Sequence, residues 1–111
     1  MRLEPMKGDN SPWGAIQDIE VLEDGVLFCS TASHGGVWLA PGKLAKMRPA
    51  LLAPSDFYKA GSPWFEEDCE ILRVVCAFPH LFKTPYAVAF ESLCKWNPAV
   101  RDAVTKEAMA R

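Results

Sequence analysis

The sequence contains no apolar run that could cross a bilayer. Its longest apolar stretch, "ILRVVCAF" at 71–78, is interrupted by Arg73 and is far shorter than the roughly 20 residues that a spanning helix needs. The opening "MRLEPMKGDN" lacks the apolar segment, of at least about seven residues, that a secretory signal requires. We therefore expect no membrane association and a cytoplasmic location.

Closely spaced metal ligands are also missing. The four cysteines are separated by 40, 7 and 18 residues, whereas zinc ligands usually lie two to four residues apart. Cys76 and His80 are four residues apart, but Pro79 lies between them. A reducing compartment disfavours disulfides, so we expect free, buried thiols, with Cys69 and Cys76 on one helix face. We expect no metal and no other cofactor.

A strong charge of one sign is absent as well. The formal net charge of −2 is not the basic balance typical of nucleic-acid-binding domains, so we expect no direct nucleic-acid binding. The charge is unevenly distributed, because residues 1–40 hold two basic and six acidic side chains. Four of these acids fall within seven positions: Asp18, Glu20, Glu23 and Asp24. They form either a solvated hairpin face or an acidic patch for a basic partner surface.

The chain of 111 residues, half of them hydrophobic, has the size and balance of a single globular domain over residues 1–111. Alternating apolar residues around Asp24-Gly25 predict a hairpin of strands at about 17–22 and 26–31. A third strand at 37–40 follows a loop in which Gly35 and Gly36 are expected to adopt positive φ. The expected sheet is a three-stranded antiparallel meander.

Three or four C-terminal helices should pack on this sheet, which makes the fold class α+β. A capping side chain precedes a proline at Ser62-Pro63, Thr84-Pro85 and Asn97-Pro98, a pattern typical of helix starts. We expect helices near 63–77, 85–95 and 98–109, the first of them central to the core. Short helical turns are expected within 41–52 and 54–61. The acids Glu66, Glu67 and Asp68 would stabilise the first turn of the central helix.

The segment "TASHGGVWL" at 31–39 contains hydroxyl groups beside His34. Neighbouring strand residues point to opposite faces, and a catalytic triad also needs an orienting acid. We therefore expect His34 to be a turn residue whose ring bonds to the carboxylates of residues 66–68. The alternative is an enzyme site formed by the same groups. Among the four tryptophans, Trp13 is expected to be the most exposed, because "SPWG" precedes the first strand.

Three segments, "SPWGAIQDIEVLEDGV", "STASHGGVWL" and "WFEEDCEILRVVCAFPHLF", resemble an uncharacterised family of small proteins and domains from plasmids and phages of proteobacteria. The resemblance covers roughly residues 11–82 and implies an origin on a mobile genetic element, in a bacterial host cell. It implies no activity. The matching positions are Trp13, Gly14, His34, Gly35, Gly36, Glu66, Glu67, Asp68, Cys69, Phe78 and Pro79.

Small proteins of such elements often act by blocking a host machine, so by analogy we expect a non-enzymatic, protein-binding inhibitor similar to anti-CRISPR proteins. Its partner would be a host protein complex, for instance a CRISPR effector with a basic nucleic-acid groove. The expected partner-binding residues are Asp18, Glu20, Glu23, Asp24, Trp13 and His34. The alternatives are the small enzyme around His34 and the Glu66–Asp68 segment, and a structural subunit or homodimer.

Overall fold

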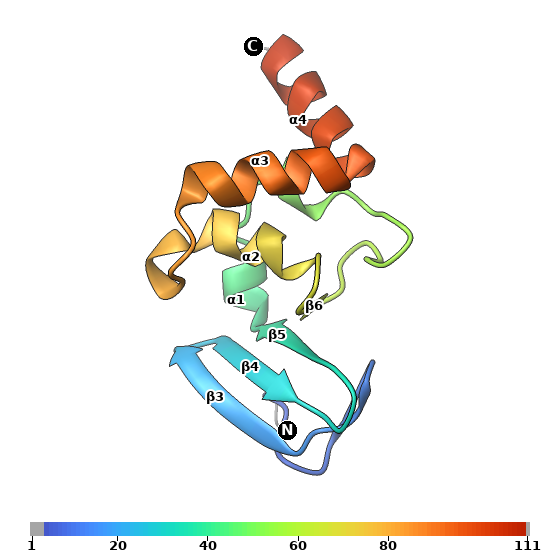
Figure 1. Cartoon of the computed structure of the whole chain (residues 1–111), viewed down its shortest axis with the longest axis vertical. Coiled ribbons are helices and arrows are strands. Elements are labelled where there is room, and N and C mark those ends of the chain that lie inside the picture. The colour runs from blue at the N-terminus through green and yellow to red at the C-terminus, as the bar shows by residue number, and fades with distance from the viewer. Residues whose placement is uncertain (1–3, 111) are drawn as a thin grey trace.

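The computed structural model describes residues 4–110 and has an elongated shape of 44 × 28 × 26 Å. A β-sheet forms one end, and the helices are stacked on it towards the C-terminus (Figure 1). The elements in chain order are β1 (Asn10–Ser11), β2 (Gly14–Ala15), β3 (Asp18–Glu23), β4 (Val26–Ser30), β5 (Gly35–Leu39), α1 (Pro41–Leu44), η1 (Pro49–Leu52), β6 (Trp64–Glu66), α2 (Ile71–Ala77), η2 (Pro79–Leu81), α3 (Tyr86–Trp96) and α4 (Pro98–Met109). The predicted α+β class is confirmed.

The main sheet has four antiparallel strands in the order β3-β4-β5-β6, rather than the three that we predicted. Its hairpin between β3 and β4 turns at Asp24-Gly25, and Gly25 has a φ of 83°. Strand β5 begins at Gly35, two residues earlier than expected. The additional strand, β6, pairs with β5 from nearly 30 positions further along the chain, as in the Gly36–Glu66 register. Such a non-local partner leaves no signal within the strand itself.

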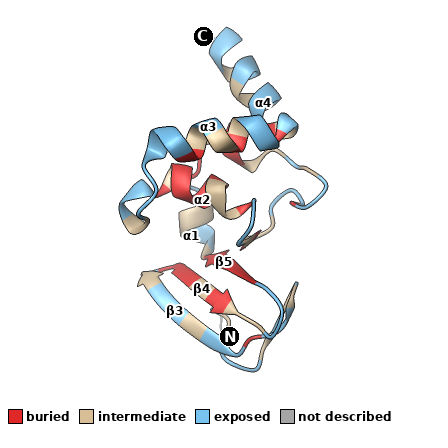
Figure 2. Cartoon of the chain, viewed as in Figure 1, coloured by how far each residue is buried: buried red, intermediate tan, exposed pale blue. Residues whose placement is uncertain are grey.

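The sheet separates two apolar clusters, because successive strand residues point to opposite faces. The larger cluster joins the sheet to the helices, and its sheet residues include Val26, Val37, Leu39 and Phe65. The smaller cluster lies on the other face and consists of Ile16, Leu27, Cys29 and Trp38. Buried residues are accordingly concentrated in β4, β5 and α2, whereas α4 is mostly exposed (Figure 2).

The helical predictions differ in outcome. Helix α4 spans 98–109 as expected, and its Asn97 side chain accepts a hydrogen bond of 3.2 Å from the Val100 amide. Helix α3 lies within one residue of the expected limits, and α1 and η1 fall inside 41–52. The predicted helix 63–77 is wrong over its first half, because 64–66 is strand β6 and α2 starts only at Ile71. The Ser62 hydroxyl accepts from the Trp64 amide, a local turn that mimics a helix cap.

The segment 54–61 also forms no helix. Instead Ser55 and Tyr58 form an isolated antiparallel bridge, and the Tyr58 ring stacks on Phe65 with centroids 4.9 Å apart. The Tyr58 hydroxyl donates to the Ser62 carbonyl at 2.8 Å, and burial raises its pKa. Packing of this aromatic side chain in the core therefore overrides the weak helical pattern.

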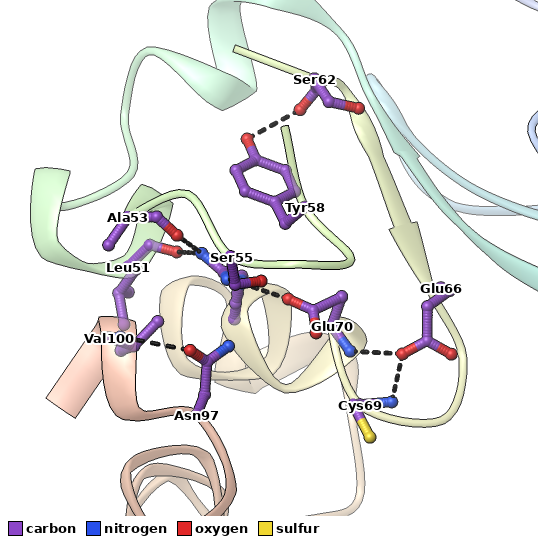
Figure 3. Close-up of polar contacts among 11 residues, drawn as sticks. Leu51, Ala53, Ser55, Tyr58, Ser62, Glu66, Cys69, Glu70, Asn97 and Val100 are labelled. Atoms are coloured by element: carbon purple, nitrogen blue, oxygen red, sulfur yellow. Dashed lines mark hydrogen bonds and ion pairs between the residues drawn. The ribbon is translucent and has the colours of Figure 1, made fainter. Parts of the chain in front are cut away.

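Helix α2 occupies the centre of the fold, as predicted, and its Arg73 side chain is fully buried. The guanidinium donates to Glu70 Oε1 at 2.7 Å, to the carbonyls of Leu51 and Ala53 at 3.0 and 2.6 Å, and to Ser55 Oγ at 3.2 Å. Figure 3 shows these groups arranged around the start of α2. Because its guanidinium donates to the carbonyls of Leu51 and Ala53, Arg73 fixes the η1 segment against the central helix α2.

Helix α4 is held to the η1 segment by a second carboxylate. Glu107 accepts from Arg48 Nε at 2.6 Å and from the Ala50 amide at 2.8 Å.

Across residues 4–110, no helix has both the length and the apolar composition needed to pass through a membrane.

Candidate functional site

Three aromatic side chains from separate segments meet in a surface groove at the β6 side of the sheet. Trp13 and Trp64 form an edge-to-face pair, with ring centroids 5.6 Å apart and planes at 90°. Phe57 stands beside them with 82% of its surface exposed. We call this the aromatic groove; its lining residues are Pro12, Trp13, His34, Phe57, Lys59, Ser62, Trp64, Glu66, Asp68 and Cys69. It consists of two adjoining pockets of about 300 and 280 Å³ that share Trp13, Phe57 and Glu66.

The small β1-β2 hairpin brings Trp13 over the sheet. Ser11 Oγ donates to the Gly14 carbonyl at 2.8 Å and accepts from the Trp13 amide at 3.2 Å. Gly14 has a φ of 119°, a backbone conformation that glycine adopts without strain. Backbone bonds tie the hairpin to the sheet, because the Gln17 amide donates to the Ser30 carbonyl at 2.8 Å, and Thr31 Oγ1, after the end of β4, lies 3.3 Å from the Trp13 carbonyl oxygen. The SPWG segment is therefore a compact turn tied to the sheet.

Gly36 provides the space that the Trp13 ring occupies. A Cβ atom at this position would overlap both the Trp13 ring and the Phe65 carbonyl oxygen. The prediction that Gly35 and Gly36 adopt positive φ is wrong, since neither is among the positive-φ glycines. They are extended residues of β5, and Gly36 is required because an indole ring and a neighbouring strand approach its backbone closely.

His34 is an exposed turn residue, as expected. Its amide donates to Thr31 Oγ1 at 3.1 Å, and its carbonyl accepts from Thr31 Oγ1 at 2.6 Å. The expected bond from its ring to the carboxylates is wrong: within residues 4–110, no hydrogen bond or ion pair joins the imidazole to residues 66–68. The backbone makes this connection instead, because the Glu67 amide donates to the Gly35 carbonyl at 2.9 Å.

The three acids at 66–68 lie in the connection from β6 to α2, and not in the first turn of a helix. The Glu66 carboxylate accepts from the amides of Asp68, Cys69 and Glu70 at 2.7, 2.5 and 2.7 Å. Figure 3 shows the last two of these bonds. Glu66 therefore shapes the loop, whereas the exposed carboxylates of Glu67 and Asp68 make no hydrogen bond or ion pair within the described part of the chain.

The four acids of the predicted patch are distributed along strand β3 and its turn. Asp18 and Glu20 are exposed, and Asp18 lies 3.5 Å from Lys7 Nζ. Asp24 is exposed in the turn at the other end of the strand.

Glu23 is engaged by two basic groups and so differs from the other three acids. Its carboxylate lies 2.5 Å from Lys43 Nζ and 3.0 Å from His80 Nε2. Hydrogen bonds, first from Lys43 and then from His80, lower the pKa of the Glu23 carboxyl. The structure thus divides the predicted partner-binding residues between the β3 edge and the aromatic groove, which holds Trp13 and His34.

The cysteines are free, as predicted, but only Cys29 and Cys76 are buried: Cys94 is half-buried, and Cys69 is exposed and lies before α2 rather than on one helix face with Cys76. Burial is the first cause of a raised pKa at Cys69, followed by Glu66 and the neighbouring acids. A nucleophilic cysteine needs the opposite shift, so this thiol is poorly suited to catalysis beside His34. Among residues 4–110, no group of three or more His, Cys, Asp or Glu side chains could hold a metal ion.

Sequence reasoning missed two parts of the groove. Phe57 lies in a bridged loop and not in the predicted short helix, and Trp64 begins strand β6 and not a helix. The expectation that Trp13 is the most exposed tryptophan is also wrong, since Trp13 is half-buried against Gly36 and Trp96 is 71% exposed at the end of α3. Exposure depends on which segments meet in space, and no local pattern reports it.

The fold and groove define a small α+β domain with an open aromatic surface site. The chain belongs to a family of domains of unknown function, DUF7007, whose model matches residues 6–111. The match extends beyond the 11–82 segment of the resemblance and includes the C-terminal helices. Comparisons with curated proteins and with solved structures yield no match.

Proposed function

We propose that this protein is a small, non-enzymatic binding protein that uses the aromatic groove to dock on a protein partner. The observation that carries the proposal is the convergence of Trp13, Phe57 and Trp64 in one surface groove. An aromatic ring that is 82% exposed, as Phe57 is, gains a large apolar contact area only when a partner covers it. Aromatic side chains of this kind are enriched at the centres of protein interfaces.

The charge around the groove supports a basic partner surface. Glu66 and Asp68 line one end of it, and the exposed acids Asp18 and Glu20 lie on β3, at the opposite edge of the sheet. Complementary charge accelerates encounter and selects among partners. Glu23 is less accessible to a partner than the other three acids, because Lys43 and His80 already contact its carboxylate.

The finer form of the proposal is that the partner is a host defence complex with a basic nucleic-acid groove, which the protein blocks in the manner of an anti-CRISPR protein. This form rests on the resemblance to plasmid and phage proteins and on the acidic character of the surface. Two observations favour binding over the enzyme alternative: the described carboxylates make no bond to the His34 ring, and burial and neighbouring acids raise the pKa of Cys69.

The experiment is affinity capture from lysate of a bacterial host with active defence systems, followed by mass spectrometry. Three tagged proteins are compared: the wild type, Phe57→Ser and Trp96→Ser. Both substitutions remove an exposed aromatic side chain, 82% and 71% exposed respectively, so both should leave the fold intact, and only the first changes the groove.

A partner retained in stoichiometric amount by the wild type and by Trp96→Ser, but lost or at least about tenfold reduced with Phe57→Ser, is the expected result. A defence effector complex as that partner would support the finer form. Equal retention by all three proteins, or retention of no protein by any of them, would contradict docking through the groove.

A further inference from the structure

We propose that the His34 end of the aromatic groove binds the cationic side chain of a lysine or arginine carried by an extended segment of the partner. The inference rests on the proposed protein-binding function and specifies the chemistry that the groove recognises. It follows from the juxtaposition of the Trp13 ring with the Asp68 carboxylate in this pocket, since that carboxylate has no ion pair or hydrogen bond within residues 4–110.

The aromatic part of the site is suited to a cation. Trp13 lines the His34 pocket, and Trp64, which meets it at 90° with centroids 5.6 Å apart, lines the adjoining pocket. Both side chains are only partly buried, which leaves π surface accessible in the groove. Tryptophan is the ring that attracts ammonium and guanidinium groups most strongly, because its face carries the negative part of the quadrupole.

The carboxylates at this end supply the matching charge. Glu66 and Asp68 line the pocket together with Trp13, His34, Phe57 and Cys69, and these six residues include no lysine or arginine. Glu66 is already held by three backbone amides. The Asp68 carboxylate is exposed and has no ion pair or hydrogen bond within residues 4–110, so it is the group that a ligand cation would meet.

The two ends of the groove differ in charge. Its second pocket shares Phe57 and Glu66 with the first but includes Lys59, which repels a cation at that end. The cation should therefore be placed at the His34 end, and the rest of the segment should run towards Lys59. The pocket volume of about 300 Å³ is at the lower limit for small-molecule sites, a size that fits one long side chain.

The test uses the four tryptophan indole N–H groups of the 15N-labelled protein as reporters in NMR spectra. The probes are two peptides, acetyl-Ala-Arg-Ala-amide and its counterpart with citrulline, which has nearly the same shape but no charge. The arginine peptide is expected to shift the indole signals of Trp13 and Trp64. The indole signal of Trp96, which lies at the end of α3 and lines neither pocket, should stay unchanged.

The matched variants are Asp68→Asn and Asp102→Asn. Both remove an exposed carboxylate, and Asp102 lies on α4, where it pairs with Arg101. Asp68→Asn is expected to weaken binding of the arginine peptide about threefold, the typical effect of one exposed ion pair, and Asp102→Asn is expected to have no effect.

Equal shifts from the two peptides, shifts confined to Trp96, or no loss of affinity with Asp68→Asn would overturn the inference. Because no partner is present, this test is independent of the capture experiment. If a partner is captured through Phe57 while the two peptides act alike, protein binding stands and recognition of a basic side chain is rejected. If the arginine peptide binds and no partner is captured, recognition of a basic side chain stands and docking on a protein partner is rejected.

Discussion

Replacement of Arg73 by Met should be among the most damaging single substitutions in the chain. The Arg73 side chain is 0% exposed and its partner Glu70 is 4% exposed. The change removes all four hydrogen bonds of the guanidinium, along with its stacking on Tyr58 at 4.5 Å. It leaves a buried carboxylate and two carbonyls, those of Leu51 and Ala53, without that partner. Removing one partner of a buried ion pair lowers the free energy of unfolding by about 3–5 kcal/mol. This is a large part of the total free energy of unfolding of a small domain, which is roughly 5–15 kcal/mol.

Urea unfolding followed by tryptophan fluorescence measures this loss of unfolding free energy. Arg101→Met is the matched control, because its ion pair with Asp102 is exposed and should contribute less than about 1 kcal/mol. The double variant Arg73→Met/Glu70→Met should lose about 1–3 kcal/mol less unfolding free energy than the sum of the losses in the two single variants, since it no longer buries an unpaired charge. A loss below about 1 kcal/mol for Arg73→Met, or strict additivity in the double variant, would refute the reasoning.

Two further predictions concern the sheet. Gly36→Ala should destabilise the fold by roughly 1–3 kcal/mol, because its Cβ would overlap the Trp13 ring, whereas Gly42→Ala, with nothing within 4 Å, should be neutral or stabilising; equal unfolding midpoints would contradict this. Because Lys43 holds the pKa of the Glu23 carboxyl below its ordinary value of 4.5, the ion pair should stabilise the fold above that pH and lose its effect as the pH falls further. The melting temperatures of wild type and Glu23→Gln should therefore differ at pH 7 and converge as the pH is lowered well below 4.5, and a constant difference would exclude this role.

Local signals in the sequence predicted the elements that depend on neighbouring residues. The Asp24-Gly25 turn needs only a glycine with positive φ, and helix α4 needs only the Asn97 cap and the proline after it. Both signals act within a few positions, so the hairpin and the helix were predicted close to their observed limits.

The parts that were not predicted depend on distant segments. Strand β6 exists because Trp64–Glu66 pairs with β5, and this pairing overrides the helix start that Ser62-Pro63 indicates. Arg73 interrupts an apolar run and gives no sign that carbonyls about 20 positions earlier will surround it. The aromatic groove likewise joins Trp13, Phe57 and Trp64, so its existence could not be inferred from any one motif.

The most direct test of the aromatic groove as the docking site is amide hydrogen exchange, measured on the protein alone and saturated with its captured partner. Docking in the groove predicts slower exchange at residues 12–14, 56–59 and 64–69 on binding, with no change in the outer turns of α4. Protection confined to α3 and α4, with exchange around the groove unchanged, would contradict it.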